Sequence, residues 1–288
     1  MNPPTFHARD GFEALREPRP TPGTWTGLWG CGSLEGLRRP TVAIVGTRAA
    51  TAYGRRLAHE FARDLGRAGC CILSGLALGI DAAAHEGALS AGAPTIGVLG
   101  GGHDCFFPPR NAGLAERICA AAGAVVSPYA PGVPAQPHQF LQRNGVVAGL
   151  ADALVVIEAP ARSGALNTAS WAAGSIPVLA VPGDVDRPHV AGCLALLRDG
   201  ATLARNAADV LEALGLGAPG VVSIPLPAID DPLQQALLAR LAQGECDLGA
   251  LIEAGGAGVG AVTAALSILE IHGVIEATDG GRYANLMR

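Results

Sequence analysis

Residues 70–89, CCILSGLALGIDAAAHEGAL, contain the transition that decides the fold. The apolar run CCIL is followed by a turn of small residues, SGLALG, and then by a segment with the composition of a helix. A short and continuously apolar run is typical of a strand covered on both faces of a sheet. A turn with so little side chain has two explanations, namely tight packing against the rest of the chain or close approach of a ligand to the backbone.

Further apolar runs repeat this pattern, at 41–46, 95–100, 124–129, 153–159 and 177–183. Helical patterns lie between the runs, at about 54–68, 80–91, 110–121, 139–150 and 164–174. In the first helical pattern Leu57, Phe61 and Leu65 share one face. Strands that alternate with helices over short connections predict an α/β fold, a Rossmann-like, doubly wound and mostly parallel sheet.

The two ends of the chain differ from this central pattern. Residues 1–40 are rich in Pro and Gly and are interpreted as an N-terminal arm, in which TWTGLWGCGSL forms an edge strand. The Rossmann-like domain is expected over 41–214, a linker over 215–228, and a second domain over 229–288. Three helical patterns and two short strands about a Gly-rich turn predict that the second domain is a small winged-helix domain.

Composition excludes several classes of function. The chain has a formal net charge of −5 and no lysine, so it is not a uniformly basic nucleic-acid binder, and an anion site has to use arginines, backbone N–H groups and helix N-termini. Its seven cysteines and seven histidines lack ligand spacing, so we expect no metal and no cofactor. We find no membrane-spanning run and no signal-peptide core, so we expect a cytoplasmic protein without membrane association.

The turns that follow the strands form the candidate ligand site, because open α/β sheets bind ligands at the carboxyl ends of their strands. Most of these turns are rich in glycine and lead into helix N-termini, where unpaired N–H groups bind anions. For one turn alone, ordinary turn chemistry is the commoner explanation. Together with Arg48, Arg143 and Arg162, the turns predict a row of phosphate sites suited to a polyanion. GxGxxG and GxxxxGK[ST] are both absent, so neither NAD nor ATP is predicted.

Longer motifs resemble those of the DNA-processing protein A (Smf/DprA) family. They are VAIVGTR, SGLALGIDAAAHEGAL, TIGVLGGG, FPPRNAGL, PHQFLQRNGVVAGLADALVVIEAPARSGALNTA and LAVPGDV, between about 41 and 205. The segment from about 228 resembles the winged-helix module of many members. The resemblance implies a protein that is not an enzyme, binds single-stranded DNA, forms a homodimer and helps load the RecA recombinase, as in natural transformation. Single-strand-binding protein is a further expected partner.

The resemblance also implies a DNA pocket, which combines the GTR and SGLALG turns with polar and aromatic side chains of later motifs. Its expected residues are Gly46, Thr47, Arg48, Ser74, Gly75, Leu76, Ala77, Gly79, Phe107, Asn111, Phe140, Arg143, Asn144, Ser163, Gly164 and Thr168. Phosphates are expected on Arg48, Arg143 and main-chain N–H groups, and a base on Phe140 or Phe107. Leu78 and Gly145 stand where the family has arginines, which bears on the affinity.

Two other classes of function stay open at this point. A nucleotide phosphoribohydrolase of the lysine-decarboxylase-like group shares this sheet, but the stretch that corresponds to its PGGxGTxxE motif is RSGALNTASWA, with Trp171 near the position of the acid. A protein-binding scaffold would use its glycines for packing alone. Glu158 could brace a neighbouring loop or act as a general base, and we favour the brace. Asp81 and His85 are interpreted as a helix cap and an ordinary histidine in preference to a catalytic pair.

Overall fold

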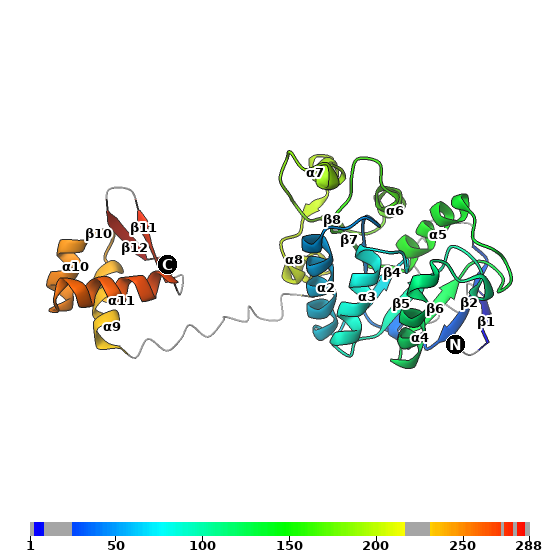
Figure 1. The fold of residues 1–288 in the computed structure, drawn as a ribbon, viewed down its shortest axis with the longest axis horizontal. Helices are drawn as coiled ribbons and strands as arrows, with labels where there is room; N and C mark the ends of the chain where they lie inside the picture. Colours follow the sequence, from blue (N-terminus) through cyan, green and yellow to red (C-terminus); the bar gives the residue numbers. More distant parts are fainter. Residues whose placement is uncertain (1–2, 9–24, 217–230, 272–273, 279–280, 286–288) are drawn as a thin grey trace. The chain divides into compact units, whose positions relative to one another are not determined.

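A computed structural model describes residues 3–8, 25–216, 231–271, 274–278 and 281–285. Residue contacts divide the chain into two compact units, Met1–Pro219 and Gly220–Arg288, and each is described by itself. In the described residues the first unit contains a nine-stranded sheet with helices on both faces, and the second contains a three-stranded sheet with helices (Figure 1). Most of the linker expected over 215–228 lies outside the described residues.

The large sheet reverses its strand order near its middle. Its strands are β1 (Thr5–Ala8), β2 (Gly27–Gly32), β3 (Thr41–Val45), β4 (Cys71–Ser74), β5 (Thr95–Val98), β6 (Ala124–Ser127), β7 (Ala153–Val156), β8 (Val178–Ala180) and β9 (Thr202–Leu203). They lie in the order β1-β2-β6-β5-β4-β3-β7-β8-β9, and all pairs from β6 to β9 are parallel. The chain moves from β3 outward to β6 and returns to β7 on the other side of β3. This confirms the predicted doubly wound, mostly parallel sheet, and it makes the β3–β7 boundary the switch point where such sheets bind ligands.

Helices cover both faces of this sheet. α2 (Ala52–Arg67), α3 (Ile80–Ser90), α4 (Ala112–Ala120) and α8 (Ala207–Ala213) pack on one face, and α5 (Pro137–Leu150), α6 (Gly164–Ala172) and α7 (Ala191–Arg198) on the other. The turns η1 (Glu35–Arg38), η2 (His103–Cys105), η3 (Pro109–Asn111) and η4 (Pro188–Val190) are 3₁₀ helices. Along β3, Val42 and Ile44 face α2 and α3, whereas Ala43 and Val45 face α5 and α6. Burial on both faces explains why the strands are continuously apolar in sequence.

The N-terminal residues differ from the arm and edge strand that their sequence indicated. β2 lies inside the sheet, antiparallel to β6 on one side and to β1 on the other. Trp25, Leu28 and Leu37 are buried in the main apolar cluster. Glycine is unfavourable inside a strand, so the segment GLWGCG has a weak strand pattern, and its pairing with β6 overrides that local preference. The sequence patterns did not predict the short edge strand β9 or the helices α7 and α8.

The second unit confirms the predicted winged helix. It contains α9 (Pro232–Leu241), β10 (Cys246–Asp247), α10 (Leu248–Gly255), α11 (Val259–Ile271), β11 (Ile275–Thr278) and β12 (Arg282–Asn285). β12 pairs antiparallel with both β10 and β11. Leucines from all three helices, including Leu237, Leu251 and Leu266, form its core. The carboxylates of Asp231 and Asp247 cap α9 and α10 by accepting the N–H groups of Leu233 and Ala250.

A search of the described helices finds none that alone has the length and apolar composition of a membrane span; the bent pair α10–α11 meets those two criteria together. Among the same residues, no group of three or more His, Cys, Asp and Glu side chains is arranged to hold a metal ion.

Candidate functional site

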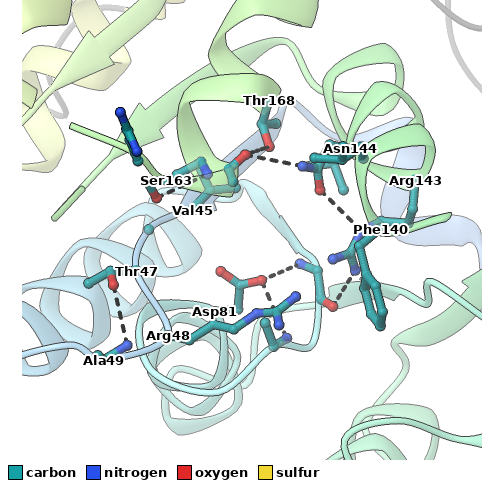
Figure 2. A pocket seen from close by; sticks show the side chains of 18 of the residues that line it. Val45, Thr47, Arg48, Ala49, Asp81, Phe140, Arg143, Asn144, Ser163 and Thr168 are labelled. Carbon is teal, nitrogen blue, oxygen red and sulfur yellow. Dashed lines mark hydrogen bonds between the residues drawn. The ribbon is translucent and has the colours of Figure 1, made fainter. Parts of the chain in front are cut away.

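A cavity of about 600 Å³ lies at the carboxyl ends of β3, β4 and β7, at the switch point of the sheet. The loops after these strands, Phe107 after β5, and residues of α5 and of the N-terminal half of α6 line it (Figure 2). Segments far apart in sequence therefore meet at one place. The predicted residues that line the cavity are Gly46, Thr47, Arg48, Gly75, Ala77, Phe107, Phe140, Arg143, Asn144, Ser163, Gly164 and Thr168.

Two of the expected residues, Ser74 and Leu76, turn their side chains into the protein. Ser74 is fully buried, and its hydroxyl donates a hydrogen bond to the carbonyl oxygen of Ile44 at 2.6 Å. Leu76 is fully buried in an apolar cluster with Leu99 and Ile118 of the face that α4 covers. These two side chains are part of the core and do not line the cavity, because the end of β4 continues the core.

Two others, Gly79 and Asn111, line a neighbouring groove and not this cavity. The amide of Asn111 donates to the carbonyl oxygens of Leu76 and Ala77 at 2.9 and 3.1 Å. Asn111 is 6% exposed, so its side chain is committed to holding the turn after β4. The motif FPPRNAGL placed Asn111 near the turn after β4, but it did not indicate that the side chain would hold that turn.

The turn of small residues after β4 is occupied by the protein's own groups. The Asp81 carboxylate accepts the N–H groups of Gly75 at 3.1 Å and of Ala77 at 3.4 Å (Figure 2). A Cβ at Gly75 would lie 2.6 Å from the Arg143 guanidinium. Gly79 has φ +84°, and a Cβ there would overlap the carbonyl oxygen of Thr47. The small residues therefore serve tight packing, and the phosphate cradle expected in this turn is already filled.

Arg143 is held inside the protein. It is 4% exposed, donates to the carbonyl oxygens of Gly75 and Val98, and places its Nε 3.3 Å from the Asn144 Oδ1. Burial lowers the pKa of Arg143 to about 10, against the opposing attraction of Asp81. Burial likewise raises the pKa of Asp81, an effect that the Arg143 charge partly offsets. Arg143 joins the ends of β4 and β5 to α5 and leaves little surface for a phosphate.

Arg48 and Arg162 are the exposed arginines of the cavity. Within the described residues neither guanidinium makes a hydrogen bond or an ion pair, so both are available to an anion. The guanidinium carbon of Arg48 lies 5.1 Å from the centroid of the Phe140 ring. Phe107 meets Phe140 edge to face with 5.9 Å between centroids, and it is 49% exposed. Arg48 therefore lies beside the two aromatic rings, and Arg162 lines the same cavity.

Two helix N-termini at this edge are capped by neighbouring side chains. The hydroxyl of Thr51 accepts the N–H of Gly54 at the start of α2, and Ser163 accepts the N–H of Ala165 at the start of α6. Glu158, 2% exposed, accepts the N–H and the hydroxyl of Thr51, both at 2.8 Å. This confirms Glu158 as a brace for the loop after β3.

The interpretation of Asp81 and His85 needs one correction. Asp81 reaches back to the turn amides and does not cap α3, whose N-cap is Gly79. His85 is fully buried with its Nδ1 2.7 Å from the Thr95 hydroxyl, and burial lowers its pKa to about 3. His85 is therefore a neutral core histidine.

Several lining residues lie within the quoted motifs but were not singled out as candidates. Pro137 and Leu141 at the start of α5, Val147 further along it, and Pro160 after β7 form apolar parts of the wall. Proline, leucine and valine are common in helices and loops. These residues are part of the site only because α5 and the loop after β7 lie at the switch point. Asp81 was noted in the sequence, but its contact with the turn amides has no local signature.

Comparisons with known proteins agree with this architecture. Residues 15–215 match the model of the DNA recombination-mediator protein A family, and residues 223–281 match that of the DprA winged helix domain. The chain is 40% identical over 264 residues to a putative DNA processing protein DprA of Mycobacterium tuberculosis, covering 88% of this chain and 67% of that protein. It is 35% identical over 265 residues to protein Smf of Escherichia coli, covering 89% and 71%.

Solved structures of DprA proteins have the same fold. DprA from Streptococcus pneumoniae superposes with a TM-score of 0.62 and 37% identity, over 65% of this chain and 66% of that chain. DprA from Helicobacter pylori, described for its single-stranded DNA binding mode, gives 0.60 and 28% identity, over 72% and 92%. The chain spans about two thirds of the length of the first of these relatives. With a family model that covers the whole large sheet from β2 onward, the chain belongs to the DNA recombination-mediator protein A family.

Proposed function

We propose that the cavity at the switch point binds single-stranded DNA, and that the protein acts on such strands as a recombination mediator. The observation that carries the proposal is the meeting of unpaired Arg48 and Arg162 with Phe107 and Phe140 in one cavity. Guanidinium groups bind phosphates whatever the sequence, and aromatic rings stack on bases of any type. Bases in a duplex are already stacked, so a site of this kind prefers unpaired strands.

The division of labour within the cavity follows from the contacts. Phosphates bind Arg48 and Arg162, whose guanidinium groups are exposed. A base stacks on the Phe107–Phe140 wall. The remaining proposed DNA contacts are the other lining residues from the family motifs: Gly46, Thr47, Ala77, Asn144, Ser163, Gly164 and Thr168. Gly75 and Arg143 contribute by holding the cavity's shape.

Among the described residues that line the cavity, no carboxylate is free to act as the acid or base of a hydrolysis reaction. Asp81 is the carboxylate present, it is 6% exposed, and two main-chain N–H groups occupy one of its oxygens. Trp171 is not among the lining residues. We therefore propose a binding protein and not a phosphoribohydrolase. Incubation with AMP should release no free base, and base release that depends on Asp81 would contradict this.

The wider role rests on family membership. The Helicobacter pylori relative is described by its single-stranded DNA binding mode, which supports the same ligand here. We propose that the chain forms a homodimer, helps load RecA on the bound strand and meets single-strand-binding protein there, in the cytoplasm and during processes such as natural transformation. Pull-down of RecA by the DNA-bound protein, and its mass in solution, test these points separately.

The binding proposal is tested by titrating fluorescent oligo-dT and a duplex of equal length at two salt concentrations. Wild type should bind oligo-dT more tightly, with affinity falling as salt rises. Arg48→Ala should weaken oligo-dT binding about tenfold and lower the salt slope by about 0.7, the value for one lost phosphate contact.

Arg67→Ala is the matched control, because Arg67 is an exposed arginine at the end of α2, at the opposite edge of the sheet. It should bind like wild type. Equal affinity for duplex and oligo-dT, or an Arg48→Ala variant that binds as tightly as the control, would contradict the proposal.

A further inference from the structure

A second groove, of about 780 Å³, adjoins the cavity between α2 and α3. α2 contributes Arg55, Arg56 and His59 to its wall, and the turn η3 contributes Arg110. Arg48 lines both this groove and the cavity. We call it the α2–α3 groove.

Positive charge dominates the α2–α3 groove although the chain as a whole carries a net charge of −5. Arg110 makes no hydrogen bond or ion pair within the described residues. Arg56 is paired with Glu60 of its own helix at 3.0 Å, and both side chains are partly exposed. Glu86 is the carboxylate among the lining residues, and it is held by the fork of Arg117. An exposed surface ion pair is weak, so Arg56 exchanges Glu60 for a phosphate at little cost.

The floor of the α2–α3 groove is made of small residues. Gly79, Ala82 and Ala83 at the start of α3 are all partly exposed there. Leu78, 37% exposed, adds an apolar spot beside them. Small side chains let a sugar–phosphate backbone lie close to the helix, with arginines standing on the walls.

Arg48 lines both the cavity and the α2–α3 groove because its backbone is fixed at the boundary between them. Gly79 has φ +84°, and a Cβ there would overlap the carbonyl oxygens of Thr47 and Arg48. The N–H of Ile80 also donates to the carbonyl oxygen of Thr47, at 3.3 Å. The loop after β3 thus rests on the start of α3, which keeps the Arg48 side chain exposed between cavity and groove.

We infer that the α2–α3 groove binds the nucleotides that flank those in the cavity, so that one unpaired strand passes over Arg48 from the cavity into the groove. The inference rests on the proposed function of the cavity and adds the path of the strand. A shared arginine favours a continuous polyanion over a second, separate ligand. Arg56 and Arg110 then contact phosphates of the flanking segment and take no part in the cavity.

The test compares two lengths of fluorescent oligo-dT, about six and about twenty nucleotides, the first near the smallest sites of single-strand binders. The variant Arg56→Ala with Arg110→Ala should bind the long strand about tenfold more weakly and lower its salt slope by about 1.4, for two lost phosphate contacts. Its affinity for the short strand should stay at the wild-type value.

The matched control is Arg38→Ala with Arg67→Ala, which removes the same charge from exposed arginines ahead of β3 and β4, at the opposite edge of the sheet. It should bind both strands like wild type. An unchanged affinity for the long strand, or an equal loss for both lengths, would overturn the inference while the cavity's function stands. Failure of wild type to bind either strand would remove the proposed function and the inference with it.

Discussion

The turns after β3 and β4 are neighbours at the switch point, and both are built of small residues, yet they are held in different ways. The turn after β4 is filled from inside, since Asp81 takes its N–H groups and Arg143 lies against Gly75. The loop after β3 is braced from behind by Glu158, which leaves the Arg48 side chain exposed. The small residues of the turn after β4 therefore serve packing, whereas the loop after β3 leaves Arg48 accessible to a ligand.

The comparison also separates two arginines that look alike in the sequence. Arg143 is buried and its guanidinium donates to main-chain carbonyls, whereas Arg48 is exposed beside Phe140. An arginine whose donors are already used contributes to the shape of a site, and one with free donors binds the ligand. We therefore expect a large loss of stability where a buried group is changed and a small one where the exposed Arg48 is changed.

The largest effect is expected for Arg143→Ala. Removing the guanidinium leaves the carbonyl oxygens of Gly75 and Val98 without this donor and Asp81 without a nearby positive charge. The free energy of unfolding should fall by about 3–5 kcal/mol, the usual range for a broken buried charge contact. Urea denaturation followed by tryptophan fluorescence measures it in the full chain, because all three tryptophans lie in the first unit. A loss below about 1 kcal/mol, the size expected for a surface pair, would show that Arg143 is not a structural contact.

The next effect is expected for Gly75→Ala. The new Cβ would lie 2.6 Å from the buried guanidinium, which has no space to move away. Overpacking of this kind should cost about 1–3 kcal/mol of unfolding free energy. Gly113→Ala in α4 is the matched control, since a Cβ there meets nothing within 4 Å, and it should stabilise the helix slightly. Equal stability of Gly75→Ala and wild type would mean that Arg143 does not pack tightly against Gly75.

The third effect is a loss of stability at acidic pH caused by His85, which lies buried in α3. Burial lowers the pKa of His85 to about 3 from 6.5, so below pH 6.5 the unfolded chain takes up a proton that the folded chain refuses. Between pH 6.5 and pH 5.5 the free energy of unfolding should therefore fall by about 1 kcal/mol because of this group. Urea melts of wild type and His85→Gln should show a shallower pH dependence for the variant in this window. Identical slopes would contradict the burial of a neutral histidine.

The smallest effect is expected for the stability of Arg48→Ala. Its guanidinium lies exposed over the Phe140 ring and has no hydrogen-bond partner within the described residues. The free energy of unfolding should change by less than about 0.5 kcal/mol, as for most surface substitutions. The same urea melt measures it, and a loss of more than about 2 kcal/mol, the range of a core contact, would remove the contrast with Arg143.

Much of the fold was predictable because its signals are local. Apolar runs such as TVAIV and ALVV, and the helical pattern of Leu57, Phe61 and Leu65, depend on periodicity within one segment. β2 was expected as an edge strand, and its place between β1 and β6 was not predictable because it depends on pairing with strands far away in the sequence. The alternation of strands and helices made the carboxyl edge of the sheet predictable as the place of the candidate site, whereas the switch point depends on the strand order and came from the structure.

The sequence by itself determined the doubly wound sheet, the winged helix and the edge at which the site lies, since each depends on patterns within short segments or on their order. Only the tertiary structure decided which amides and arginines are free. The carboxylate that fills the turn after β4 comes from within α3, and the guanidinium against Gly75 comes from 68 residues further along the chain. Burial and hydrogen bonding of such groups depend on how the turn, α3 and α5 pack together, which no sequence pattern records.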